Sequence, residues 1–222
     1  MEKINAIIFD MDGTLYQFPD DIPFSSSPLG EAVKENIISF IAKEFKLLDN
    51  EARQKYSEIQ TKYNGEISLG LEKEHGIDRM RFFEENWGID PENIITSEPN
   101  LKEELERLDI RCILLTAAPR IWAKRVLKYM GISTIFDDQM YTGEPDVRKP
   151  SPEAFRIITT KLGLDASTVV SIGDQEYSDI IPAKEVGART VRIGKGVQSD
   201  ADFIAPDVKS ALALLRQEGL LV

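Results

Sequence analysis

The sequence contains one cysteine and one histidine among its 222 residues. Cys112 therefore cannot form a disulfide within this chain, and His75 cannot build a histidine-rich metal site. A cysteine-dependent phosphatase with Cys-x5-Arg spacing would need Arg at position 118, which is Ala118. We expect Cys112 to be a buried structural thiol, because it lies in the apolar run 110–115, and His75 to lie exposed at a helix end.

Long apolar runs and an excess of basic residues are also missing. No apolar stretch approaches the roughly 18 residues of a membrane span, so we expect no membrane association and a cytosolic protein. Lysine and arginine total 27 against 38 acidic residues, which gives a net charge of −11. Such a charge excludes nucleic acid as the expected partner, and an anionic substrate would need a local positive site. The oligomeric state stays open.

Short apolar runs alternate with helix-like patterns over most of the chain. Runs rich in Ile, Val and Leu are typical of strands buried on both faces of a parallel sheet. They lie at 4–9, 110–115, 169–172 and 190–193, with weaker candidates at 139–141 and 202–204. Helix starts are indicated by Pro119 ahead of Trp122, by Ser151 with Pro152, and by Asp207. The alternation predicts an α/β fold with a Rossmann-like, doubly wound parallel sheet.

Residues 16–97 interrupt this alternation. Positions 18–28 carry three prolines and three consecutive serines, which is typical of a linker. Four amphipathic helical patterns follow, at 31–48, 50–63, 67–75 and 78–87. We therefore expect a core made of residues 1–15 and 98–222, and an inserted all-helical domain over 16–97.

Polar side chains follow the predicted strands at the point where each strand ends. In an open parallel sheet the carboxyl ends of the strands share one edge, where ligands bind. A spacing of two residues also places two acids on one face of an extended chain. The residues predicted to converge at this edge are Asp10, Asp12, Thr116, Lys149, Asp174 and Asp179.

Several carboxylates at one edge of the sheet repel one another. Two of them 5 Å apart repel by about 3 kcal/mol at an effective dielectric near 20, and further acids add to this. Either protons are retained or a divalent cation binds among them. Oxygen ligands favour Mg²⁺, which often shares a substrate phosphate. We therefore expect Mg²⁺ as the cofactor, which together with Lys149 would supply the positive potential that the net charge denies.

Four ordered motifs carry a family resemblance. Asp10-x-Asp12-Gly13-Thr14, Thr116, Lys149 and Gly173-Asp174-x4-Asp179 resemble the motifs of the haloacid dehalogenase superfamily. The motifs and the strand–helix pattern cover essentially the whole predicted core. A helical insertion after the first motif resembles the cap of the phosphatases in that superfamily. The resemblance implies a Rossmann-like core and phosphoryl transfer through an aspartyl-phosphate intermediate.

The resemblance also implies a role for each catalytic residue. Asp10 would be the nucleophile, and a carboxylate needs no activating base at neutral pH. Asp12 would protonate the leaving oxygen and then activate water. Thr116 and the backbone N–H of Ala117 would hold phosphate oxygens, while Lys149 would offset negative charge. Dehalogenases of the superfamily lack an acid at the position of Asp12, which argues against cleavage of a carbon–halogen bond.

The same resemblance implies a metal site. Asp10, the backbone carbonyl of Asp12 and Asp174 would ligate Mg²⁺, with Asp179 orienting these ligands. One departure follows Thr116, where many members carry Asn or Ser and this chain has Ala117. We expect this change to alter specificity before it abolishes activity.

Three functions remain open from the sequence. The leading one is an Mg²⁺-dependent phosphatase acting on a small phosphomonoester, such as a nucleotide or a sugar phosphate. The alternatives are a phosphomutase that uses the same residues and a non-catalytic phosphate-binding protein on this fold. We expect residues of the inserted segment to select the substrate; the candidates are Tyr16, Phe18, Tyr63, Glu66, Arg81 and Trp87.

Overall fold

The computed structural model describes residues 3–18, 22, 24–96, 98–136, 138–196 and 198–221. The predicted domain limits at residues 1, 97 and 222 lie outside the described residues, as do Pro19 and Pro23 of the predicted linker. The chain forms two compact units. Unit 1 comprises Met1–Asp21 and Ile95–Val222, and unit 2 comprises Ile22–Ile94.

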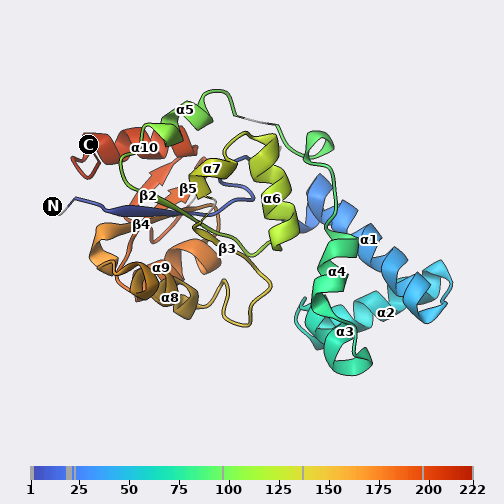
Figure 1. Ribbon diagram of the computed structural model, residues 1–222. Helices are drawn as coiled ribbons and strands as arrows, with labels where there is room; N and C mark the ends of the chain where they lie inside the picture. The colour runs from blue at the N-terminus through green and yellow to red at the C-terminus, as the bar shows by residue number, and fades with distance from the viewer. Residues whose placement is uncertain are drawn as a thin grey trace. The chain divides into compact units, whose positions relative to one another are not determined.

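Unit 1 contains one six-stranded sheet in which every pair of neighbouring strands is parallel (Figure 1). The strands are β1 (Ala6–Phe9), β2 (Arg111–Leu115), β3 (Met140–Tyr141), β4 (Val169–Gly173), β5 (Arg189–Ile193) and β6 (Phe203–Ala205). Their order is β3-β2-β1-β4-β5-β6. The predicted α/β class with a doubly wound parallel sheet is therefore confirmed. All residues of β1 and β4 are buried, as continuous apolar runs require.

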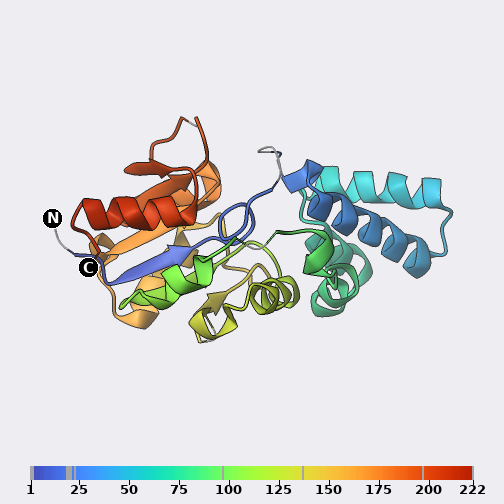
Figure 2. The same cartoon turned by 90° about the horizontal axis from the view of Figure 1, so that it is seen from above.

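Helices cover both faces of this sheet. The helices of unit 1 are α5 (Leu101–Glu106), α6 (Arg120–Tyr129), α7 (Ser133–Phe136), α8 (Pro152–Leu162), α9 (Ile181–Glu185) and α10 (Val208–Gln217). On one face, Ala6 and Ile8 of β1 form a buried cluster with Phe155 of α8 and Ala183 of α9. Helices α5 and α10 contact each other on the opposite face (Figures 1 and 2). Alternate residues of β1 thus face the layer formed by α8 and α9.

The strand order reverses beside β1. From β1 the chain adds β2 and β3 on one side, then crosses to β4 and adds β5 and β6 on the other. In doubly wound sheets the loops diverge at such a reversal and leave a crevice outside the carboxyl ends of the strands. The reversal of the strand order therefore lies between β1 and β4.

Unit 2 consists of helices over its described residues, 22 and 24–94, which contain no strand. They are α1 (Pro28–Phe45), α2 (Asp49–Lys62), α3 (Ile67–His75) and α4 (Arg79–Asn86), with single 3-10 turns at Phe24–Ser26 and Pro91–Asn93. Helices α1 and α2 pack side by side (Figure 2). The rings of Phe40 on α1 and Phe82 on α4 meet edge to face, with centroids 5.6 Å apart.

The predicted linker is shorter than expected at its carboxyl end. Pro28 is the first residue of α1, because the side chain of Ser27 accepts a hydrogen bond from the N–H of Gly30 and caps the helix. Proline suits this position, since the first turn needs no N–H donor. Among the helices of the described residues, none combines the length and the apolar character required to cross a membrane.

Candidate active site

Three strands end side by side where the sheet order reverses. Phe9 of β1 pairs with Leu114 of β2 and with Ile172 of β4, so the three carboxyl ends are level. The residues that follow these strands are brought to one edge; they are Asp10 and Asp12 after β1, Thr116 after β2 and Asp174 after β4. The predicted convergence is thus observed in the arrangement of the strands.

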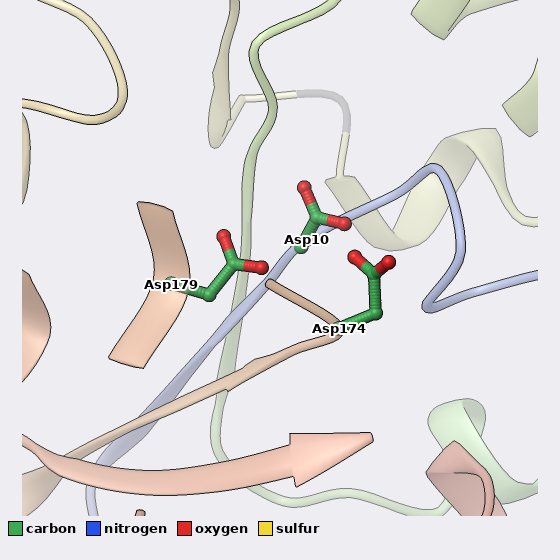
Figure 3. Close-up of side chains that lie close together, drawn as sticks. All are labelled: Asp10, Asp174 and Asp179. Atoms are coloured by element: carbon green, nitrogen blue, oxygen red, sulfur yellow. The ribbon is translucent and has the colours of Figure 1, made fainter. Parts of the chain in front are cut away.

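Asp10, Asp174 and Asp179 form a compact carboxylate cluster (Figure 3). One oxygen from each lies within 4.8 Å of the other two. The Oδ1 atom of Asp174 is buried and has no hydrogen-bond partner among the described residues. A buried carboxylate oxygen without a partner is costly, and a set of oxygen donors around it fits a hard cation such as Mg²⁺.

The pKa values of two of these acids support this fit. Burial raises the pKa of Asp10 to about 7; Lys149 opposes the shift and Asp179 adds to it. Burial, and then the charges of Asp10 and Asp179, raise the pKa of Asp174 to about 8. Burial is the main cause of both shifts, and a divalent cation bound here would stabilise the ionised carboxylates.

Lys149 lies between two of the carboxylates. Its Nζ atom is 2.8 Å from Oδ1 of Asp10 and forms a second ion pair with Asp179. Only 4% of Lys149 is exposed. Although burial lowers the pKa of Lys149, the two carboxylates raise it above its ordinary value, so the ammonium stays charged. The lysine is presented just ahead of α8, which begins at Pro152 and is capped by Ser151.

Asp179 is held rigidly by its own loop. It belongs to a π-helical turn, Glu176–Ile180, that follows β4. Its Oδ2 atom accepts a hydrogen bond from the N–H of Gln175 at 2.8 Å, and its Oδ1 atom accepts one from Ser178 Oγ at 3.1 Å. Gly173 leaves room for it, because a Cβ atom there would collide with Cβ and Cγ of Asp179. The loop therefore fixes the carboxylate beside Lys149.

Asp12 lies in a different environment from Asp10. It is partly buried, and its Oδ1 atom accepts hydrogen bonds from the indole Nε1 of Trp122, at 2.7 Å, and from the hydroxyl of Tyr16. Burial raises the pKa of Asp12, while hydrogen bonds from Tyr16, Trp122 and Thr116 oppose the shift. Asp10 instead accepts a hydrogen bond from Thr14 Oγ1 at 3.1 Å. Each of the two acids of the first motif thus accepts hydrogen bonds from its own set of side chains.

Thr116 and Ala117 lie at the end of β2. Thr116 is buried, and its Oγ1 atom accepts a hydrogen bond from the N–H of Ala118 at 3.0 Å, which turns the chain sharply. Ala117 is exposed at this turn. Gly143 passes close by, since a Cβ atom on it would collide with the carbonyl of Ala117.

Sequence reasoning did not find the contacts of Tyr16 and Trp122 with Asp12. From the sequence, Trp122 served only to locate the start of a helix, and Tyr16 only as a substrate-selecting candidate. Both are fully buried. A buried tryptophan or tyrosine needs a partner for its N–H or O–H group, and this requirement was the available signal.

The other substrate-selecting candidates have contacts within their own units. Tyr63 donates a hydrogen bond to Glu74, and the ring of Trp87 stacks on Phe24 with centroids 6.1 Å apart. The guanidinium of Arg81 pairs with Glu44 and Glu85. Of the remaining two, Phe18 packs edge-on against Tyr16 in unit 1, and Glu66 directly precedes α3. None of these contacts tests a role in substrate selection.

Comparison with known proteins defines the class of this chain. The family described as haloacid dehalogenase-like hydrolase matches residues 4–187. The chain therefore belongs to the haloacid dehalogenase-like hydrolases. The match confirms the predicted family and the prediction that the protein is an enzyme.

Two named relatives are similar over most of their length. The glyceraldehyde 3-phosphate phosphatase of Methanocaldococcus jannaschii is 27% identical, and the match covers 90% of this chain and 89% of that protein. The phosphoglycolate phosphatase of Neisseria gonorrhoeae is 24% identical, with 93% and 89% covered.

The fold is shared with solved structures of the same family. A HAD phosphatase from Thermococcus onnurineus superimposes with a TM-score of 0.65 at 21% identity, covering 97% of each chain. A 2-haloacid dehalogenase from Pseudomonas syringae pv. Tomato superimposes with a TM-score of 0.66 at 16% identity, covering 97% of this chain and all of the other. Because a phosphatase and a dehalogenase fit equally well, the fold alone does not distinguish the two reactions.

Proposed function

We propose that the protein is an Mg²⁺-dependent phosphatase that hydrolyses a small phosphomonoester through an aspartyl-phosphate intermediate on Asp10. The surroundings of Asp10 are the observation that carries this proposal. Its carboxylate lies 2.8 Å from the ammonium of Lys149 and within 4.8 Å of two further acids. The names of the relatives, which are phosphatases of small phosphorylated compounds, support the same class of reaction.

In the first step one carboxylate oxygen of Asp10 attacks phosphorus. The new O–P bond forms as the bond from phosphorus to the leaving oxygen breaks, and Asp12 gives its proton to that oxygen. A protonated Asp12 is consistent with its raised pKa. Lys149 lowers the repulsion between the nucleophile and the anionic phosphate, because it lies against Asp10.

In the second step water replaces Asp10 on phosphorus. The ionised Asp12 takes a proton from the water, the oxygen of the water bonds to phosphorus, and the bond to Asp10 breaks. Inorganic phosphate leaves and Asp12 is protonated again, so both groups are restored. Thr116 and the N–H of Ala117 are proposed to hold phosphate oxygens at the end of β2 throughout.

The proposed metal ligands are the carboxylates of Asp10 and Asp174 and the backbone carbonyl of Asp12. Asp179, which its own loop fixes in place, would orient them. When bound, Mg²⁺ would neutralise phosphate charge and orient the transferring group. The unpartnered Oδ1 atom of Asp174 is what favours a cation here.

The predicted helical segment 16–97, which contains unit 2, is proposed to act as the cap that selects the substrate. The residues at the strand ends offer contacts for phosphate and metal, so contacts to the rest of a substrate must come from elsewhere. We propose a small phosphorylated metabolite as the substrate and the cytosol as the compartment.

The proposal is tested by release of phosphate. Wild-type protein with Mg²⁺ and p-nitrophenyl phosphate should turn over, and EDTA should stop the reaction. Asp10→Asn keeps the shape of the side chain but removes the nucleophile, so we expect turnover to fall at least about 10³-fold. Asp109→Asn, an exposed acid outside the site, is the matched control and should retain activity. Retained turnover in Asp10→Asn would remove Asp10 from the nucleophilic role.

A panel of substrates then identifies the metabolite and separates hydrolysis from isomerisation. Glyceraldehyde 3-phosphate, 2-phosphoglycolate, pyrophosphate, nucleoside monophosphates and hexose phosphates are each incubated with the protein. A phosphatase releases inorganic phosphate from at least one of them. A phosphomutase would instead convert a sugar phosphate to its isomer with little release of phosphate.

A further inference from the structure

Two aromatic donors converge on a single oxygen of Asp12. The indole N–H of Trp122 lies 2.7 Å from Oδ1, and the hydroxyl of Tyr16 donates to the same atom. Trp122 is in the first turn of α6 and is 110 residues away from Asp12 in the sequence. Both aromatic side chains are completely buried. Donors from two separate segments therefore meet on one carboxylate oxygen.

The surrounding chain keeps both donors in place. A β-bridge between Asp12 and Tyr16 closes the loop after β1, and Gly13 allows the tight turn with a φ of +86°. Phe18 packs edge-on against the Tyr16 ring, with centroids 5.6 Å apart. Trp122 is fixed by the first turn of α6. Neither donor can rotate away from Asp12 without disturbing a packed core.

Two donors on one oxygen restrict how the carboxylate acts. Rotation about the Cβ–Cγ bond would break both hydrogen bonds, so the plane of the carboxylate is fixed. Oδ1 has its lone pairs engaged by the two aromatic donors, neither of which donates to Oδ2, and Thr116 donates a further hydrogen bond to the carboxylate. An indole N–H can only donate, so Trp122 cannot itself exchange a proton in the reaction.

We propose that Tyr16 and Trp122 are positioning residues that hold Oδ1 of Asp12 and thereby direct Oδ2 toward the leaving oxygen and, later, toward water. This inference rests on the proposed function, since it assigns to Asp12 the transfer of a proton in each half-reaction. It adds two residues from outside the four motifs to those that the proposed reaction requires. Without them the carboxylate keeps its charge but loses the two hydrogen bonds that hold Oδ1.

The test removes each donor while keeping an aromatic ring at its position. The variants are Tyr16→Phe, Trp122→Phe and the double variant, with Tyr129→Phe, an exposed tyrosine, as the control. Two substrates are compared, p-nitrophenyl phosphate and glycerol 2-phosphate. The nitrophenolate leaves readily without a proton, whereas the alkoxide of glycerol needs one. The ratio kcat/KM reports the steps up to formation of the phosphoenzyme, which is where the leaving group departs.

We expect the two substrates to respond differently. For glycerol 2-phosphate, kcat/KM should fall about 10- to 100-fold in the double variant, since misplacing a proton donor by 1 Å can cost about 10²-fold. For p-nitrophenyl phosphate, kcat/KM should stay within about 3-fold of wild type. Its kcat and KM should fall together, because slower activation of water lets the phosphoenzyme accumulate.

The outcomes separate this inference from the proposed function. Equal losses of kcat/KM for the two substrates would show a purely structural role and would overturn the inference. No loss for glycerol 2-phosphate in the double variant would overturn it as well. If wild type turned over neither substrate nor any of the metabolites, the proposed function would itself fail. If Trp122→Phe does not fold, Tyr16→Phe alone decides, because it removes one of the two donors.

Discussion

Replacing Lys149 by methionine isolates the electrostatics of the site. Methionine keeps an unbranched side chain of similar length but has no charge. Lys149 is 4% exposed, its Nζ atom lies 2.8 Å from Asp10, and it also pairs with Asp179. The substitution therefore leaves two buried carboxylates without their cation. No other part of the fold needs to change.

The size of the effect follows from these distances. At an effective dielectric near 20, two unit charges 2.8 Å apart attract by about 6 kcal/mol, and relief of the buried ammonium offsets part of this. Breaking a buried ion pair typically costs about 3–5 kcal/mol. We therefore expect Lys149→Met to lower the free energy of unfolding by about 3–5 kcal/mol at pH 8.5 in EDTA.

The loss should depend on pH with a definite sign. The pKa of Asp10 is raised from 3.8 to about 7 in the folded protein, mainly by burial. Its contribution to stability is therefore fully present below pH 3.8 and is lost as the pH rises through about 7. Lys149 lowers this pKa, so its removal moves the pKa further up and deepens the loss at alkaline pH. At 1.36 kcal/mol per pH unit, the penalty at pH 8.5 should exceed that at pH 5.5 by up to about 2 kcal/mol.

Urea unfolding followed by tryptophan fluorescence measures both quantities. Lys124→Met, at an exposed position of α6, should change stability by less than about 0.5 kcal/mol and controls for the loss of a lysine. A penalty below about 1 kcal/mol at pH 8.5 would refute the reasoning. So would a penalty that shrinks from pH 5.5 to pH 8.5.

Two further predictions concern other parts of the molecule. Gly173→Ala should cost about 1–3 kcal/mol in urea unfolding and lower phosphatase turnover at least 10-fold, because its Cβ atom would displace Asp179; wild-type values for both would contradict the proposed packing. The NMR titration of His75 should give a pKa below 6.5, because neighbouring atoms remove part of the water around the exposed ring and because the Nζ atom of Lys55 lies 3.0 Å from Nε2. Lys55→Met should raise that pKa and Lys34→Met should not, so equal effects of the two would exclude Lys55 as a cause.

The long elements could be predicted from local patterns. The limits of the four main strands agree with the predicted runs to within two residues, because strands buried on both faces need continuous apolar residues. Helix α8 begins where Ser151 and Pro152 indicated, since capping depends only on neighbouring residues. The short helices α5, α7 and α9 were not predicted; they have six, four and five residues, too few for a periodic pattern.

The burial of the single cysteine and the exposure of the single histidine were also predicted correctly. Cys112 is buried in β2, and its thiol pKa is raised to about 11 by that burial. His75 is exposed as the last residue of α3. Both outcomes follow from the apolar or polar character of the immediate neighbours.

Local sequence patterns were enough to establish the α/β class, the family, and the order in which acids, threonine and lysine follow the strands. These properties depend on short runs of neighbouring residues, so they can be recognised before the three-dimensional structure is known. Which side chains touch one another could be learned only from the folded chain. Lys149 reaches Asp10 across 139 residues and Trp122 reaches Asp12 across 110, because parallel strands and the loops after them bring remote segments to one edge. No local sequence pattern predicts these two contacts, because they depend on the register of the sheet and on the packing of helices against it.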